Sequence, residues 1–294
     1  MDISVIIPTR DRARYLEDCL KTLVGQLPAS RMEVIVIDDG SKDDTADVAR
    51  RCGAKCISQS PAGLNAARNK GAAISDGRII GYLDDDVLVS PRWAESIVEA
   101  FDSPGCQAAG GRISLQFEAP KPRWLNESLF LYLSSWDLGD EFREMAPHEI
   151  PLGLNSAATR EAFEGLGGFA GGLDREGGSL LSAGDNDFFL RLRRDGGKIW
   201  YVPEAAVVHR VPPERMTKSW FRRRAWWQGI SDARLGRVVG DDPHRAGATS
   251  AMRETLRAFR ALPILLANLS KGRGPLTAEL WVRHSMGRVA GLRR

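Results

Sequence analysis

The chain has few cysteines and no long apolar run, and both shortages exclude large classes of protein. Its 294 residues include four cysteines, whose spacing forms neither a disulfide framework nor a completed zinc motif. We therefore expect four reduced, mostly buried thiols, as in a cytoplasmic protein. The longest apolar stretch, residues 261–269, is much shorter than the about 20 residues that a membrane-spanning helix requires. We expect it to be a buried helix, with a segment lying on a membrane surface as the alternative.

Three short motifs are missing as well. The N-terminal residues Met1–Pro8 contain no basic region and no cleavage site, so we expect no signal peptide. No G-x-G-x-x-G pattern follows the first apolar run, which argues against a dinucleotide-binding dehydrogenase. No G-K-[S/T] loop is present, which argues against a P-loop NTPase.

The small net charge of +3 conceals an uneven distribution. Residues 211–294 hold 17 Lys/Arg and 6 Asp/Glu, a balance of +11, so residues 1–210 carry −8. A basic C-terminal segment can face phosphates, anionic lipid or an acidic polymer. The alternative is a solvated basic helical bundle, and the sequence favours neither.

The first hundred residues alternate short apolar runs with helical patterns. The predicted strands are Ile3–Ile7, Val34–Ile37, Lys55–Ser58 and Ile79–Leu83, and the predicted helices are 12–26, Thr45–Cys52, Leu64–Ser75 and Pro91–Phe101. Pro8 should end the first strand. The order predicts an α/β fold with a mostly parallel, Rossmann-like sheet covered by helices on both faces. Ligands should bind beyond the carboxyl ends of its strands, at residues 8–11, 38–43, 60–64 and 84–87.

The later residues are less regular and then become basic. We expect a strand at Gly111–Phe117, a glycine-rich loop at 165–178, a helix from Asp185 to about Arg194, and strands at Lys198–Val202 and Ala206–His209. The composition changes after Pro212-Pro213. We therefore divide the chain into a main α/β domain, 1–212, and a basic, Trp/Arg-rich helical extension, 213–294.

Three adjacent carboxylates, Asp84-Asp85-Asp86, give the strongest chemical signal. They follow a predicted strand directly and repel one another unless water or a cation neutralises them. Hard oxygen ligands suit Mg²⁺ or Mn²⁺. Because strand residues alternate faces, Asp84 and Asp86 should share a side. A solvated acidic turn is the alternative.

Two further acidic positions are ambiguous. Asp39, in Asp38–Ser41, has the chemistry to accept from a nucleobase or ribose, although an Asx turn is the plainer interpretation. Asp185 begins a helix whose Phe188 and Leu192 should face inward. It is either an N-cap or a general base for an acceptor hydroxyl. Asp187 is the alternative candidate for the base, although first-turn acidity explains it.

Basic and aromatic residues supply the remaining candidates. His209 ends a strand and is either structural or a ligand of metal or diphosphate. Arg68 has the chemistry to bind phosphate or to stack on a base, or is simply a helix-surface arginine. Three tryptophans, Trp220, Trp226 and Trp227, alternate with arginines. This pattern suits binding of single-stranded nucleic acid or sugars, a helix lying on a membrane, or a helix buried against the main domain.

With these residues in order, the sequence resembles family 2 glycosyltransferases of GT-A fold. The resemblance covers about residues 3–210. It is carried by Ser4–Arg10, Val34–Ser41, Ala66–Gly71, Tyr82–Asp86, Asn155, Arg160-Glu161, Gly167–Phe169, Gly184–Arg193 and Tyr201–Ala205. One of these motifs alone would be weak evidence, whereas the ordered set is strong.

The resemblance implies a role for each matching residue. Donor-nucleotide binding falls to Pro8, Thr9, Arg10, Asp39, Arg68, Asp84 and Asp85. Asp84 and Asp86 match the D-x-D pair, Asp86 being the more direct metal ligand, and His209 matches a residue that assists the metal or diphosphate. Asp185 matches the base of an inverting transfer. Gly184 stands where the family usually has Glu, so acceptor handling should differ; Asn155, Gly184 and Trp227 are the acceptor candidates.

The predicted activity is therefore inverting transfer of a sugar from a nucleoside-diphosphate sugar, with UDP favoured, to a hydroxyl acceptor on a glycan or lipid carrier. The cofactor would be Mn²⁺ or Mg²⁺. The predicted location is cytoplasmic, with peripheral contact to the membrane as an option. No nucleic acid is expected as partner. A nucleotidyltransferase would require a glycine-rich loop at Pro8–Asp11. An aspartate phosphatase would place its acidic pair after the first strand. A nucleic-acid-binding protein would leave the acidic motifs unexplained.

Overall fold

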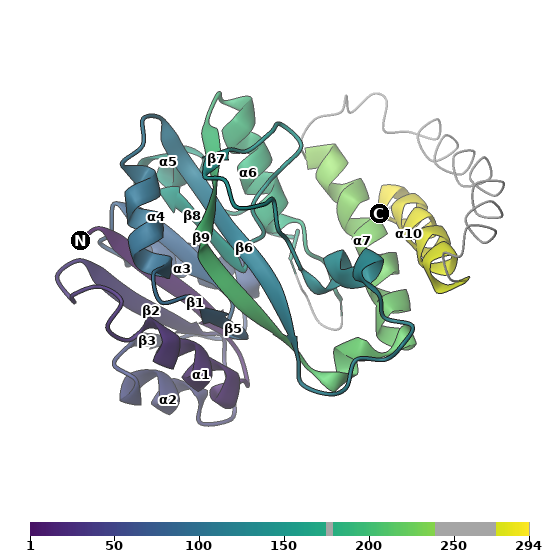
Figure 1. Ribbon diagram of the computed structural model, residues 1–294, viewed down its shortest axis with the longest axis horizontal. Coiled ribbons are helices and arrows are strands. Elements are labelled where there is room, and N and C mark those ends of the chain that lie inside the picture. Colours follow the sequence, from purple (N-terminus) through teal and green to yellow (C-terminus); the bar gives the residue numbers. More distant parts are fainter. Residues whose placement is uncertain (175–178, 239–274, 294) are drawn as a thin grey trace. The chain divides into compact units, whose positions relative to one another are not determined.

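The computed structural model describes residues 1–174, 179–238 and 275–293. In these residues the strands form a nine-stranded sheet of order β3-β2-β1-β4-β8-β6-β9-β5, with β7 paired to β9 (Figure 1). The parallel half consists of β1 (Ile3–Thr9), β2 (Met32–Asp38), β3 (Lys55–Ser58) and β4 (Ile79–Leu83). The antiparallel half adds β5 (Val87–Val89), β6 (Cys106–Phe117), β7 (Arg143–Glu144), β8 (Asn155–Thr159) and β9 (Lys198–Val211). The predicted helix-flanked α/β sheet is confirmed.

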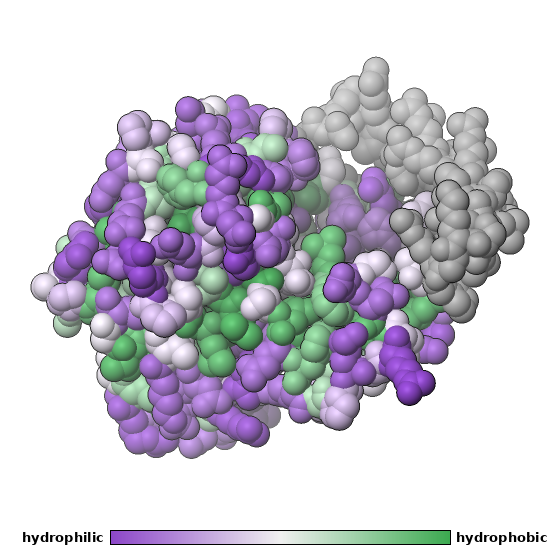
Figure 2. Space-filling model, in the orientation of Figure 1, coloured by the Kyte–Doolittle hydropathy of each residue, from purple (hydrophilic) through white to green (hydrophobic). Residues whose placement is uncertain are grey.

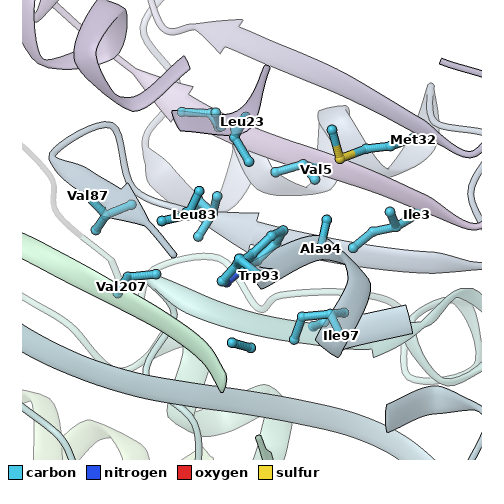
Figure 3. Close-up of a cluster of buried hydrophobic side chains, with 14 of the residues drawn as sticks. Ile3, Val5, Leu23, Met32, Leu83, Val87, Trp93, Ala94, Ile97 and Val207 are labelled. Carbon is cyan, nitrogen blue, oxygen red and sulfur yellow. The ribbon is translucent and has the colours of Figure 1, made fainter. Parts of the chain in front are cut away.

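Helices cover both faces of the sheet because its strands project apolar side chains from both faces in alternation. The helices are α1 (Ala13–Leu23), α2 (Thr45–Arg51), α3 (Leu64–Ala73), α4 (Trp93–Phe101), α5 (Arg160–Gly165) and α6 (Gly184–Arg194). Val5 and Ile7 pack in one cluster with residues of α1 and α4, whereas Ile6 packs in another with residues of α5 and α6. Figure 3 shows Trp93 and Ile97 of α4 in the first cluster. The inward Phe188 and Leu192 of α6 are buried as predicted.

The helices α1 and α2 turn polar residues outward, and the surface over them is largely hydrophilic (Figure 2). The sixteen predicted bounds of the first four strands and four helices all lie within three residues of the observed ones, and half of them match. Helix α4, for example, begins at Trp93 rather than Pro91. Cys19 and Cys106 are buried, Cys52 and Cys56 are partly buried, and all four are free thiols.

The prediction that β1 ends at Pro8 is wrong, because the strand continues to Thr9. Pairing between β1 and β4 stops at Ile6, whereas pairing between β1 and β2 continues through Thr9 and Asp38. The carbonyl of Thr9 accepts from Asp39 on the β2 side. The backbone groups of adjacent strand residues point toward opposite neighbouring strands. Since Thr9 faces β2, the nitrogen of Pro8 faces the β4 side, where strand pairing has already ended. Its missing N–H therefore costs no ladder bond.

Two other predictions about strands need correction. Residues 198–211 form one strand, not two, because β7 pairs at Trp200 and β5 pairs at Val207, on either side of Pro203. Strand β5 was not predicted at all. It has three residues, and its partner β9 lies more than a hundred residues away in the sequence, so no local sequence pattern predicts it.

By internal contacts the chain forms two compact units. The first contains residues 1–116, 134–171 and 184–210, and the second contains the described parts of 117–133, 172–183 and 211–294. The boundary expected between 212 and 213 stays a prediction. The predicted buried helix at 261–269 lies outside the described residues.

The second unit is built on two helices, α7 (Lys218–Val238) and α10 (Pro275–Arg293), with short 3₁₀ helices at Glu127–Leu133 and Pro213–Met216. Phe221 of α7 contacts the rings of Trp124 and Tyr132 at 5.5 and 6.1 Å between centroids. Arg222 pairs with Glu279 at 2.7 Å, joining the two helices. Among the helices in the described residues, none has the length and apolarity needed to cross a membrane.

Candidate active site

The three aspartates lie in the turn that joins β4 to β5, at the carboxyl end of the parallel strands. The turn is tight because β5 reverses to pair with β9, which sets Val87 opposite His209. The alternation expected of an extended strand does not apply, since Asp85 and Asp86 are in the turn itself. Asp85 and Asp86 share a partner, Arg12, whereas Asp84 contacts Arg68.

Asp85 is held from two sides. Thr9 Oγ1 donates to its Oδ2 at 2.7 Å, and Arg12 Nε lies 2.8 Å from its Oδ1. Burial raises the pKa of Asp85 to about 7, against the opposing effects of Arg12 and Thr9. The predicted donor residues Thr9 and Asp85 are therefore in contact. The N-terminal strand and the acidic turn form one cluster.

Asp86 connects Arg12 to His209. Arg12 donates to Oδ2 of Asp86 at 2.8 Å, and His209 Nε2 lies 3.5 Å from the other oxygen, Oδ1. The backbone N–H of Arg210 also donates to the carbonyl of Asp86 at 2.9 Å. The structure thus brings together the carboxylate and the imidazole that were predicted as metal ligands.

These donors fit a hard divalent cation. Carboxylate oxygens suit Mn²⁺ or Mg²⁺, which usually take one or two carboxylates and complete their shell with substrate phosphates, whereas an imidazole nitrogen favours Mn²⁺, the softer of the two. Within residues 1–174, 179–238 and 275–293, no three His, Cys, Asp or Glu side chains converge in a complete cage.

Arg68, Gly153 and Asp185 form the second part of the site. Arg68 is buried on α3, and one of its terminal nitrogens lies 3.1 Å from both Asp84 Oδ1 and the carbonyl of Gly153. The N–H of the same glycine donates to Asp185 Oδ2 at 2.7 Å. Gly153 therefore connects Asp185, the candidate base, to Arg68, the arginine that contacts the acidic turn. A Cβ at Gly153 would lie 2.8 Å from both side chains, so a larger residue there would displace Arg68 or Asp185 from its present position.

Asp39 stabilises the loop that precedes α3. Its carboxylate accepts from the N–H groups of Ala62 and Gly63 at 2.8 and 3.0 Å, and from Gln59 Nε2 at 2.8 Å. A carboxylate has about four acceptor sites, so one further hydrogen bond is available for a nucleobase. Its predicted contact with the base stays a prediction.

The surroundings of Gly184 explain why this position lacks the Glu that the family usually has. A Cβ at this position would lie 2.0 Å from Nδ2 of Asn65, whose side chain is buried and donates to the carbonyl of Ala170 at 2.7 Å. The place of the usual Glu side chain is therefore taken by an asparagine from α3. No local sequence signal pointed to this exchange.

Several predicted residues have other contacts in the structure. Asn155 is fully buried, accepts from Trp93 Nε1 at 2.8 Å and donates to the carbonyl of Ala205 at 2.8 Å. Arg10 is half exposed. Asp187 pairs with Arg191 at 2.8 Å, which agrees with the structural role expected for it.

The proposed roles of Asn155, Arg10, buried Pro8 and Trp227 stay predictions, the last of these belonging to α7 in the second unit. Arg12 and Gly153 were missed. Arg12 stands four residues after Pro8, at the start of the predicted helix 12–26, and a buried acidic triplet should have prompted a search for its counterion.

Comparisons with known proteins assign the chain to a family. The family model described as glycosyl transferase family 2 matches residues 4–167. The chain is 24% identical to the glucosyl-dolichyl phosphate glucuronosyltransferase of Haloferax volcanii, over 79% of this chain and 76% of that protein. It is 31% identical to the pre-mycofactocin glycosyltransferase of Mycobacterium tuberculosis, over 78% of this chain but only 46% of that protein.

A solved structure has the same fold. It is the mannosyltransferase PcManGT of Pyrobaculum calidifontis, in complex with GDP-Man and Mn²⁺. The two chains are 20% identical with a TM-score of 0.61, over 98% of this chain and 85% of that one.

Proposed function

Since the chain belongs to glycosyl transferase family 2 and is a glycosyltransferase, we propose that it transfers a sugar from a nucleoside-diphosphate sugar to a hydroxyl acceptor with inversion. The observation that carries this proposal is the link through Gly153. Its N–H holds Asp185 and its carbonyl holds Arg68, which contacts Asp84. A candidate base and a candidate diphosphate site thus meet across one residue.

The chain's residues suit the steps of such a transfer. The acceptor oxygen would attack the anomeric carbon as the bond from that carbon to the diphosphate oxygen breaks, and Asp185 would take the acceptor's proton. Attack from the face opposite the leaving group inverts the anomeric centre. Hydrogen bonds from Gly153 and Asn186 to the two oxygens of Asp185 fix the direction of its carboxylate.

Asp86 and His209 would hold Mn²⁺ or Mg²⁺, and Asp84, which pairs with Arg68, is the further candidate ligand. When bound, the cation stabilises negative charge on the departing diphosphate. Arg68 would contact phosphate oxygens, and Thr9, Asp39 and Asp85 would contact the nucleotide. The preference for uracil rests on the family resemblance, while the fold neighbour is complexed with GDP-Man.

The acceptor is proposed to be a glycan or lipid-linked hydroxyl in polysaccharide or cell-envelope synthesis. The balance of +11 in residues 211–294 supports peripheral contact with anionic lipid. The family assignment favours sugar transfer over the nucleotidyltransferase and phosphatase alternatives.

Calorimetric titration tests the donor site. UDP, GDP and dTDP are each titrated with Mn²⁺ and with EDTA, into the wild type and into Asp185→Asn. We expect one nucleotide to bind in a metal-dependent manner, and we expect Asp185→Asn to bind it equally well. With a sugar acceptor that supports turnover, the same variant should be slower by roughly 10²–10⁴-fold.

Either of two outcomes would contradict the proposal. Absence of binding by any of the three nucleotides, with or without metal, would remove the donor site. Near-normal turnover of Asp185→Asn would remove Asp185 from the role of base.

A further inference from the structure

Arg12 is a mostly buried cation whose contacts the proposed transfer does not use. Its guanidinium forms two ion pairs, Nε with Asp85 Oδ1 and a terminal nitrogen with Asp86 Oδ2, each at 2.8 Å. Two adjacent buried carboxylates of the acidic turn are thereby tied to the start of α1. The contact with Asp86 is also a hydrogen bond. A planar guanidinium fixes the direction of such a bond more firmly than the mobile ammonium of a lysine would.

Tyr15 holds this guanidinium in place. The Cζ atom of Arg12 lies 4.4 Å from the centroid of the Tyr15 ring, and the Cζ atom of Arg210 lies 4.5 Å from the same centroid. Arg210 is fixed in turn by Asp18 on α1 at 2.6 Å. One aromatic ring thus contacts two guanidinium groups, each within the range of a cation–π interaction.

Both arginines act on Asp86. Arg12 occupies its Oδ2, and the N–H of Arg210 occupies its carbonyl, while Oδ1 remains on the side of His209, 3.5 Å from Nε2. Asp86 has little rotational freedom when its backbone carbonyl and one of its carboxylate oxygens are both held. The direction of Oδ1 is therefore set by groups that would not touch a metal.

We propose that Arg12, supported by Tyr15, is a positioning residue that orients Asp86 toward His209 so that the two can bind a divalent cation. This inference rests on the proposed function. Groups that hold a metal ligand from behind typically change metal affinity by 10–100-fold when they are removed.

Simple electrostatics predicts the opposite effect, and this makes the inference testable. Removing a positive charge beside two carboxylates makes the site more negative, so charge alone would strengthen cation binding. Orientation predicts weaker binding. The sign of the change separates the two explanations.

The experiment measures Mn²⁺ affinity by calorimetry in the presence of a saturating nucleoside diphosphate, without turnover. The variants are Arg12→Lys, Arg12→Met and Tyr15→Leu. We expect Arg12→Lys and Arg12→Met to bind Mn²⁺ about 10–100-fold more weakly, and Tyr15→Leu to show a smaller loss in the same direction. Arg14→Met is the matched control, because Arg14 is an exposed arginine on the same helix; it should bind like the wild type.

Thermal unfolding of every variant in EDTA shows which of them are folded, and Tyr15→Leu keeps the test usable if Arg12→Met is not. Tighter or unchanged Mn²⁺ binding by Arg12→Lys and folded Tyr15→Leu would overturn the inference. If the wild type itself binds no nucleotide with Mn²⁺, the proposed function fails instead, so the two failures are distinct.

Discussion

Asn65 and Gly184 are matched at the level of single residues. The Asn65 amide occupies the space that a side chain at 184 would need, at 2.0 Å from the position of its Cβ. Asn65 cannot move away cheaply because it is buried and hydrogen-bonded to Ala170. An acidic side chain at 184 would therefore have to displace this asparagine, so Gly184 and Asn65 depend on each other.

This pairing predicts a non-additive double mutant. Gly184→Ala should lower the free energy of unfolding by about 1–3 kcal/mol, because it overpacks the contact. Asn65→Ala should lower it by about 1 kcal/mol through the lost hydrogen bond. The double variant should be more stable than the sum of the two effects, by about 0.5–3 kcal/mol, as expected for residues in contact.

Urea denaturation measures all three, with Gly165→Ala as the control. Gly165 lies in α5 with nothing within 4 Å of its Cβ position, so its substitution should cost nothing. Strict additivity of the Asn65 and Gly184 variants would show that the two positions do not compete for space.

Sequence reasoning located the acidic residues of the site better than it located their partners. Asp39, the aspartate triplet and Asp185 stand at predicted element ends, where local pattern is informative. Arg12 and Gly153 gain their meaning from contacts with residues far along the chain, such as Asp86 and Asp185. A lone arginine or glycine carries no local sign of such a contact.

The same limit applies to the elements. The parallel strands and α6 were predicted because each has its own apolar period. Strand β5 and the continuity of β9 were not, since both depend on pairing across a long sequence separation. β5 matters most for the site, because its pairing with β9 sets His209 beside the acidic turn.

Helices α7 and α10 approach each other closely through glycines. A Cβ at Gly287 would lie 2.1 Å from the carbonyl oxygen of Trp226, and one at Gly229 would lie 2.0 Å from that of His284. Backbone atoms cannot yield as a flexible side chain can. The distance between the two helices is therefore set by residues that lack a side chain.

Gly287→Ala should separate the two helices, and we expect it to lower the free energy of unfolding by about 1–3 kcal/mol. Gly236→Ala is the matched control, since Gly236 is also helical but has nothing within 4 Å of its Cβ position. It should stabilise the protein by about 0.5–1 kcal/mol through helix propensity. Chemical denaturation compares them, and equal effects of the two substitutions would show that the close approach is not a constraint.

At the scale of the whole molecule, the charge is divided along the chain. The residues up to 210 are net acidic and those from 211 are net basic. An acidic nucleotide site needs a cation before it can receive a diphosphate, and a basic segment attracts anionic surfaces on its own. The two parts should therefore respond differently to salt and to divalent ions.

Charge reversal on α7 tests the contact with anionic lipid. Lys218 and Arg223 are exposed on this helix, and Arg14 and Lys42 are exposed in the first unit. Each basic residue near an anionic membrane contributes about 1 kcal/mol. The Lys218→Glu/Arg223→Glu variant should thus bind anionic vesicles at least about 10-fold more weakly than the wild type. Arg14→Glu/Lys42→Glu changes the net charge equally and should bind nearly as well as the wild type.

Vesicle co-sedimentation at low salt measures this difference, with zwitterionic vesicles as the blank. Binding should also fall steeply in about 1 M salt, where the Debye length is about 3 Å. Equal losses in the two variants would show that net charge, not the C-terminal segment, drives adsorption. If a single-stranded oligonucleotide competes with the vesicles for the wild type at equal charge concentration, the segment is a general polyanion site, and lipid is not its specific partner.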